Sequence, residues 1–130
     1  MITEDYVSFE TAKLLKEKGF DENTPVNYFV GDDKPRGCVV GEMIYHKRLE
    51  EDTHLIACPT LQMAMKWLRE LLHLEIYLEH DTIQENNNWW YQIGKYTKGF
   101  INIEHESSSD YATYEEACEA AIKYCLENLI

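Results

Sequence analysis

Residues 59–78 read PTLQMAMKWLRELLHLEIYL, and the spacing of the apolar residues changes inside this stretch. As far as Leu72, apolar side chains recur every three or four residues, which is the spacing of one face of an α-helix. From Leu74 onward they alternate with Glu75 and Tyr77, which is the period of a half-buried β-strand. The stretch therefore predicts a helix over residues 60–72, capped by Thr60, and a strand that begins at residue 74. The predicted buried side of the helix consists of Leu61, Ala64, Met65, Leu68, Leu71 and Leu72, with Met63 and Trp67 beside it.

Downstream of this strand the sequence predicts two more strands. Three asparagines at residues 86–88 are turn formers, and the β-rich runs 89–96 and 100–105 are separated by a short segment that ends in Gly99. A short glycine-containing loop between two such runs is typical of a hairpin. We therefore expect a three-stranded antiparallel meander over residues 74–105.

The C-terminal segment predicts a further helix. Thr113 and Glu116 have the spacing of a capping box, in which each end residue satisfies a free backbone amide of the other. The apolar side of the following residues includes Cys118 and Cys125, seven positions apart and therefore on the same side of the helix. We expect these two cysteines to be small apolar residues of the core.

Upstream of residue 59 the prediction is a helix followed by a hairpin. The helix begins after Ser8, a good N-cap, and ends at Gly19, which can adopt the left-handed conformation of a C-cap at no steric cost. Residues 26–30 and 38–45 are the expected strands of the hairpin, with a turn over residues 31–37. Residues 50–52, all acidic, are expected to form a solvated connection.

The fold class that follows is α+β. We expect an antiparallel sheet, made of the three-stranded meander and the N-terminal hairpin, packed with three helices. A chain of 130 residues suits a single domain over residues 1–130. Within it, residues 1–58 would supply a helix and the hairpin, and residues 59–130 a helix, the meander and the last helix.

The charge of the chain argues against two classes of partner. There are 24 acidic and 12 basic side chains, a formal net charge of −12, and basic residues never exceed an adjacent pair. Such a chain offers no basic patch for nucleic acid, and an anionic membrane would repel it. The N-terminus shows no signal peptide, so we expect a cytoplasmic protein with reduced cysteines. An acidic chain could also mimic a polyanion such as DNA and inhibit a nucleic-acid-binding protein, and this alternative stays open.

Residues with chemical potential are present without a motif that would join them. The five histidines, His46, His54, His73, His80 and His105, lack ligand spacing to one another and to a cysteine. Cys58 precedes a helix and could be activated by His54, which leaves a small hydrolase with a His/Cys site as a second alternative. No phosphate-binding loop or nucleophile elbow occurs. We therefore expect no enzyme activity, no metal and no cofactor.

One face of the predicted meander is unusually aromatic. If Leu74 and Ile76 point toward the helices, strand alternation turns Tyr77 to the opposite side. In the hairpin we expect Tyr91, Ile93, Ile101 and Ile103 to point inward. The candidate interaction face on the other side then consists of Tyr77, Trp90, Gln92, Tyr96 and Phe100, together with Asn102.

Two explanations of this aromatic face remain open. Residues 1–58 could cover it, since large aromatic side chains are mostly part of a core. Alternatively it binds a protein partner or a second copy in a homodimer, because aromatic side chains dominate the affinity of protein interfaces.

Three segments carry a resemblance to a known group of proteins. Residues 8–20 (SFETAKLLKEKGF), 59–70 (PTLQMAMKWLRE) and 114–130 (YEEACEAAIKYCLENLI) resemble small uncharacterised proteins of gut bacteria and of their phages and other mobile elements. From residue 59 onward the order of elements also resembles the phage-type α-β-α sandwich domain. Neither resemblance implies a reaction or a catalytic residue. Together they imply a product of a phage or another mobile element.

Overall fold

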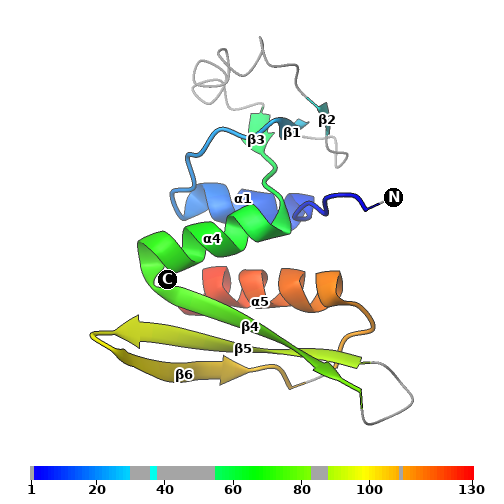
Figure 1. The fold of residues 1–130 in the computed structure, drawn as a ribbon. Helices are drawn as coiled ribbons and strands as arrows, with labels where there is room; N and C mark the ends of the chain where they lie inside the picture. Colours follow the sequence, from blue (N-terminus) through cyan, green and yellow to red (C-terminus); the bar gives the residue numbers. More distant parts are fainter. Residues whose placement is uncertain (1, 30–35, 38–54, 83–87, 109) are drawn as a thin grey trace. The chain divides into compact units, whose positions relative to one another are not determined.

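A computed structural model describes residues 2–29, 36–37, 55–82, 88–108 and 110–130 (Figure 1). The chain divides into two compact units, Met1–Thr60 and Leu61–Ile130. Each unit combines helix with antiparallel sheet, so the predicted α+β class is confirmed. The two units meet in the sequence close to the predicted division at residues 58 and 59. That both fold as one domain stays a prediction.

The first unit begins with helix α1, Phe9–Glu17, whose two ends match the sequence signals. The Ser8 hydroxyl accepts a hydrogen bond from the backbone N–H of Thr11 at 3.2 Å, as an N-cap does. At the other end Gly19 has a φ of 95°, and the N–H of Phe20 donates to the carbonyl of Leu15. This left-handed glycine ends the helix and returns Phe20 to the core, where it is buried.

A small sheet in the order β2-β1-β3 completes the first unit. Strand β1 is Val26–Phe29, and it pairs with β2, Arg36–Gly37, and with β3, Leu55–Ala57, antiparallel in both cases. The expected strand over residues 26–30 is thus present, and it pairs with residues that the sequence predicts as turn. Residues 38–45, the expected second strand, lie outside the described residues. Strand β3 is not predicted by the sequence pattern.

Tyr28 ties the elements of the first unit together. Its hydroxyl donates a 2.8 Å hydrogen bond to the carbonyl of Val7, and its ring meets that of Phe9 edge-on at 5.3 Å. The N–H of Val7 in turn donates to the carbonyl of Pro59 at 3.1 Å. These contacts join the segment before α1, strand β1 and the segment after β3. The buried apolar side chains of the unit include Val7, Ala12, Leu15, Phe20, Tyr28, Leu55, Ile56 and Cys58.

The second unit contains the predicted meander. Its sheet has the order β4-β5-β6, with β4 at Leu74–Asp81, β5 at Asn88–Thr97 and β6 at Phe100–Glu106, all antiparallel. The prediction of three strands over residues 74–105 is confirmed.

Two helices belong to this unit. Helix α4, Leu61–Leu72, leads into β4, and helix α5, Tyr114–Asn128, packs against β4, β5 and α4 (Figure 1). The Thr113 hydroxyl accepts from the N–H of Glu116 at 3.1 Å, so the predicted cap of α5 is confirmed. The fully buried residues of α5 include both Cys118 and Cys125, which act as core residues.

The buried side of α4 differs from the prediction at two positions. Leu71 is 59% exposed, whereas Trp67 is buried together with Ala64 and Leu68. The helix ends one residue later, and His73, with a φ of 57°, starts the change to strand. The apolar pattern of the sequence thus continues to the end of the helix, although Leu71 in its last turn is already exposed.

Candidate interaction face

Strand register determines which side chains share each face of the meander. His105 pairs with Ile93 and stacks on Tyr124 of α5, so the Ile93 side faces the helix. Because side chains alternate along a strand, the residues between point to the opposite side. We call this side the outer face. It carries Glu75, Tyr77 and Glu79 from β4, Trp90, Gln92, Gly94 and Tyr96 from β5, and Ile101, Ile103 and Glu106 from β6.

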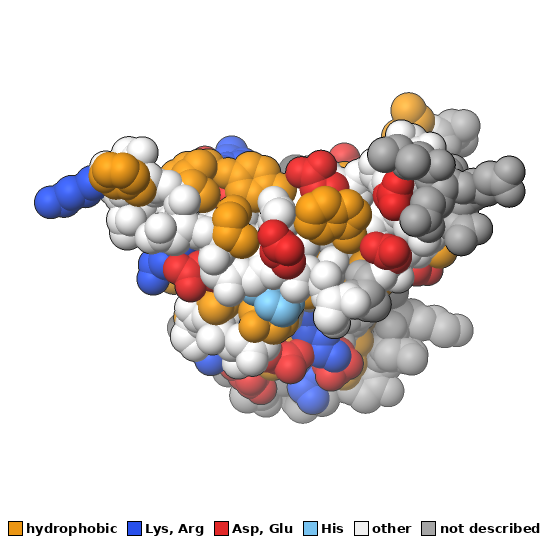
Figure 2. All heavy atoms as spheres, turned by 90° about the horizontal axis from the view of Figure 1, so that it is seen from below, with side chains coloured by type: hydrophobic (Ala, Val, Ile, Leu, Met, Phe, Trp, Pro, Cys, Tyr) orange, Lys and Arg blue, Asp and Glu red, His pale blue; other side chains and the backbone are white. Residues whose placement is uncertain are grey.

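Apolar and acidic side chains are mixed on this surface. Figure 2 views the molecule from the sheet side, and hydrophobic side chains extend along it with acidic side chains between them. Ile101 is 47% exposed and Ile103 50%, and Tyr96 is also exposed, while Tyr77, Trp90 and Gln92 are half-buried. The second unit by itself therefore leaves the outer face uncovered, with more apolar area than a solvated sheet needs.

Four of the five predicted face residues lie together, and the fifth does not. Tyr77 pairs directly with Gln92, and Trp90 and Tyr96 follow on the same side of β5. Phe100 instead pairs with Thr97, on the helix-facing side, at the end of the hairpin, where it is 73% exposed.

The error comes from the turn between β5 and β6. Lys98 and Gly99 both have positive φ, 38° and 85°, and they form a two-residue hairpin turn. Turns with positive φ at both residues are common in hairpins because their twist matches that of the two strands. The sequence-based assignment implies a three-residue loop, and a shift of one residue moves every side chain to the other face. The expectation for Ile101 and Ile103 is therefore also wrong, because both point outward, and Asn102, which pairs with Lys95, belongs to the helix-facing side.

Gly94 shapes the middle of the outer face. A methyl group built at Gly94 would lie 2.7 Å from Cγ2 of Ile101 and 3.4 Å from Cε2 of Tyr77. The two side chains thus occupy the space above the glycine, one from each neighbouring strand. Such packing over a strand glycine compensates for its missing side chain. Beyond it β6 contains a bulge, because Glu104 has no partner between Ile103 and His105.

Three polar side chains, Tyr96, Glu75 and Arg69, interact beside the apolar centre that Tyr77 and Ile101 form over Gly94. The Tyr96 hydroxyl donates to Oε2 of Glu75 at 3.4 Å, and Nη1 of Arg69 lies 3.6 Å from Oε1 of the same carboxylate. The hydrogen bond with Tyr77, desolvation and the negative charge of Glu75 raise the pKa of Tyr96 from 10.0 to about 12. Tyr96 is therefore a neutral hydrogen-bonding group on this face at any physiological pH.

This arrangement predicts a late ionisation. In a titration followed by the ultraviolet absorbance of tyrosinate, Tyr91 and Tyr96 should both ionise near pH 12. Tyr96→Phe should therefore remove the contribution of one tyrosine from that step, and Glu75→Gln should shift the contribution of Tyr96 to lower pH. Because the folded state keeps this proton above the unfolded pKa of 10.0, stability should fall as the pH rises from 10 to 12. Glu79→Gln, which lies on the same face of β4 beyond Tyr77, is the control. If Tyr96→Phe lost absorbance near pH 10 and not near pH 12, the described contacts of Tyr96 would be contradicted.

The helix-facing side of the sheet carries a row of stacked rings that the sequence did not predict. His80 stacks on Trp89 at 4.1 Å, and His105 stacks on Tyr124 at 3.6 Å. Tyr91 lies between them, and burial raises its pKa to about 12. These contacts explain two of the five histidines as packing residues. The register could have indicated the contact of His80, which pairs with Trp89, but not that of His105, which pairs with Ile93 and stacks on a residue of α5.

Among the other candidates, those that the structure describes are not brought together into a site. Cys58 is buried, and its Sγ donates to the carbonyl of Val7 at 3.7 Å, while His54, its expected partner, lies outside the described residues. Burial raises the pKa of both Cys118 and Cys125 to about 12, so these thiols stay protonated. Within the described ranges, no three His, Cys, Asp or Glu side chains are grouped closely enough to hold a metal ion.

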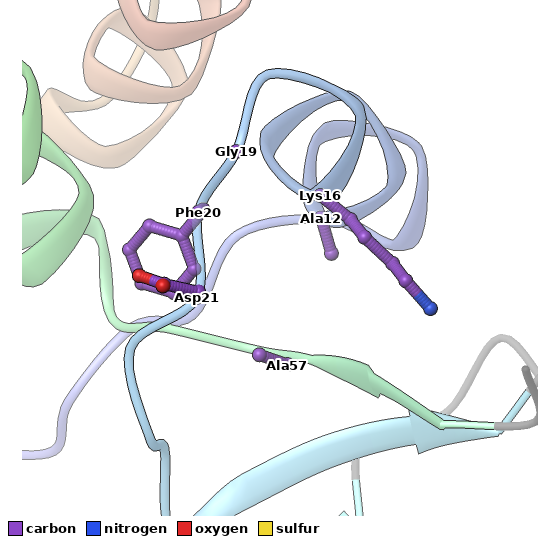
Figure 3. Close-up of a pocket in the computed structure, with 6 residues that line it drawn as sticks. All are labelled: Ala12, Lys16, Gly19, Phe20, Asp21 and Ala57. Atoms are coloured by element: carbon purple, nitrogen blue, oxygen red, sulfur yellow. The ribbon is translucent and has the colours of Figure 1, made fainter. Parts of the chain in front are cut away.

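A small pocket lies in the first unit, between α1, the residues after it and β3 (Figure 3). Its volume is about 210 Å³, below the usual range of ligand pockets. Lys16 extends away from the Phe20 ring in this view, and its Nζ donates to the carbonyl of Leu55 at 3.4 Å. The lining residues are Ala12, Lys16, Gly19, Phe20, Asp21 and Ala57, which form no catalytic group.

Comparison with known proteins gave no relatives: no family model, no curated protein and no solved structure matches this chain. None of the helices in the described part of the chain has the length and apolar character needed to cross a membrane.

Proposed function

We propose that this chain is a small acidic protein of the cytoplasm that binds another protein through the outer face and has no catalytic activity. A single observation carries the proposal. Tyr77, Trp90 and Tyr96 share that face with Ile101 and Ile103, and the helices α4 and α5 pack on the other side. Aromatic side chains supply a large contact area at little entropic cost, which suits them to recognition.

The polar groups of the face support this role. Gln92 donates to Oε1 of Glu106 at 2.7 Å, and Glu75 accepts from Tyr96. These hydrogen bonds fix the side chains around the apolar centre before a partner arrives, which reduces the entropic cost of binding. An apolar centre with a polar surround is the usual anatomy of a protein interface. An origin on a phage or another mobile element belongs to the same proposal.

The test removes two aromatic side chains from the outer face. Trp90→Ala combined with Tyr96→Ala should reduce capture of the partner from a native lysate by about tenfold or more, since central aromatic residues each contribute about 2 kcal/mol to such interfaces. The matched control is Phe100→Ala, which removes an exposed aromatic residue from the opposite side of the same sheet. Captured proteins are identified by mass spectrometry, and the melting temperature is measured in parallel.

Three results would contradict the proposal. The double variant could capture the same proteins in the same amounts as the parent chain. It could lose its cooperative melting transition, which would show that these side chains are core residues. Finally, the substitutions could leave the amount of captured protein unchanged, while added salt reduces it steeply. That is the behaviour expected of a polyanion mimic.

A further inference from the structure

We propose that a second copy of this chain pairs with the free edge of β6, antiparallel, so that two three-stranded sheets join into one. This inference concerns the backbone edge of β6, whereas the proposed function rests on the aromatic side chains of the outer face. Ile101 and Ile103 take part in both, with their backbone at the edge and their side chains on the face. The proposed occupant of the edge is β6 of the other copy, related by a two-fold axis at Asn102.

The edge of β6 is open in the described part of the chain. In the sheet order β4-β5-β6, no described strand pairs with the far side of β6. A two-residue turn makes Thr97 and Phe100 a hydrogen-bonded pair, and hydrogen-bonded pairs alternate along antiparallel strands. The backbone N–H and C=O groups of Ile101 and Ile103 therefore point away from β5, toward the free side.

The composition of this edge favours pairing. Natural edge strands are often protected by charged side chains, proline or a β-bulge. The first half of β6, residues 100–103, has none of these, because the bulge and both glutamates follow Ile103. Ile101 and Ile103 are both about half exposed and flank the proposed axis. The bulge at Glu104 limits regular pairing to the first half of the strand.

Charge and register select one arrangement. With Asn102 opposite Asn102 of the other copy, Ile101 faces Ile103 twice, and all four isoleucines lie on the same side of the joined sheet. Lys98 of one copy then lies opposite the acidic end of β6, Glu104 and Glu106, of the other. A shift of one residue would bring outward-pointing backbone groups against inward-pointing ones, so it is excluded. A shift of two residues keeps the backbone groups matched but places only one pair of isoleucines opposite each other, so it is less favourable.

The opposite edge of the sheet does not offer the same match. Strand β4 carries Glu75, Glu79 and Asp81 on one side, and antiparallel pairing of β4 with itself would bring these carboxylates together. Like charges placed directly opposite are destabilising. Pairing at β6 therefore ends with two copies instead of growing into a filament, as a two-fold interface does.

The first experiment detects the axis by a cross-link. Asn102→Cys would place two thiols at a non-hydrogen-bonded pair, where Cα atoms are about 4.5 Å apart, within the range of a disulfide. Cys58, Cys118 and Cys125 are buried, and the fourth cysteine, Cys38, lies outside the described residues, so it is replaced by serine in the background. With oxidised glutathione as oxidant, we expect a dimer band on a non-reducing gel. Lys95→Cys is the matched control, because Lys95 is the partner of Asn102 on β5, is also exposed, and lies one strand further from the axis.

The second experiment measures mass without any cross-link. In sedimentation equilibrium at about 0.15 M salt, where charges beyond about 8 Å are screened, the parent chain should approach twice its mass of 15.3 kDa. Ile103→Lys, which adds the charge that edge strands use against pairing, should give the monomer mass. A parent chain that is monomeric at about 100 µM would overturn the inference. Equal cross-linking of the Lys95→Cys and Asn102→Cys variants would overturn it as well.

The experiments distinguish failure of the edge pairing from failure of the proposed binding through the outer face. The outer-face variant Trp90→Ala with Tyr96→Ala should keep the dimer mass, because neither side chain lies on the β6 edge. A monomeric parent chain that still captures its partner through the outer face would refute the edge pairing alone. A dimer that captures nothing through this face would refute the proposed function alone.

Discussion

Replacing Ile122 by alanine will lower the free energy of unfolding of the Leu61–Ile130 unit by about 2–5 kcal/mol. Ile122 is 0% exposed and lies in α5, the helix that packs against β4, β5 and α4. Alanine removes three carbon atoms from a place that no neighbour can easily fill, so the loss of burial is increased by a cavity. All three tryptophans of the chain lie in this unit, and their fluorescence in a urea titration reports its unfolding.

The control for this variant is on the same helix. Glu127→Ala removes an exposed side chain that forms a 3.9 Å ion pair with Lys123, and such pairs contribute about 0.3–0.5 kcal/mol. The urea midpoint should therefore change little in Glu127→Ala and strongly in Ile122→Ala, with the same slope in both. A loss of less than about 1 kcal/mol for Ile122→Ala would mean that α5 does not close the core at this position.

The second large effect is expected at Tyr28 in the Met1–Thr60 unit. Tyr28→Ala removes a ring that is 4% exposed and contacts Phe9, and substitutions of this size cost about 3–5 kcal/mol. Tyr28→Phe keeps the ring and removes the hydroxyl that donates to the carbonyl of Val7. The carbonyl of Val7 then loses the hydroxyl that donates to it, so we expect the free energy of unfolding to fall by about 1–2 kcal/mol.

Amide hydrogen exchange separates the two contributions of Tyr28. The N–H of Val7, which donates to Pro59, and the N–H of Cys58, which donates to Val26, report the closure of this unit. Their protection should fall moderately in Tyr28→Phe and be largely lost in Tyr28→Ala. Equal protection in Tyr28→Phe and the parent chain would show that the hydroxyl bond contributes nothing to stability.

The helices were predictable because their signals are local. Ser8, Gly19 and Thr113 each act within one helical turn, and the structure shows each of them in the predicted capping position or conformation. The change of period at Leu74 likewise placed the start of β4 correctly.

The strands were harder to predict where a strand is very short or pairs with a segment far away in the sequence. Strand β3 has three residues, too few for an alternating pattern, and it exists because it pairs with β1 almost thirty residues earlier. The face of β6 depended on the number of residues in one turn. The Lys-Gly turn has two residues, and counting three moved Phe100 onto the outer face and moved Ile101 and Ile103 off it.

In the candidate interaction face, too, local patterns were predicted and contacts between strands were not. The side of β5 was predicted correctly because its register with β4 follows from alternation, and Tyr77, Trp90, Gln92 and Tyr96 lie on one face. The contacts of Gly94 could not be predicted, since they involve residues from three strands. They depend on the register that the sequence left open.

In the proposed interaction, the glycine at position 94 affects which shape of partner fits the outer face. Because no side chain stands there, the Tyr77 ring and the Ile101 methyl group lean over the backbone from both sides and fill the gap. At this position the middle strand therefore projects no side chain from the outer face. A flat or gently convex surface would fit it better than a protruding loop would.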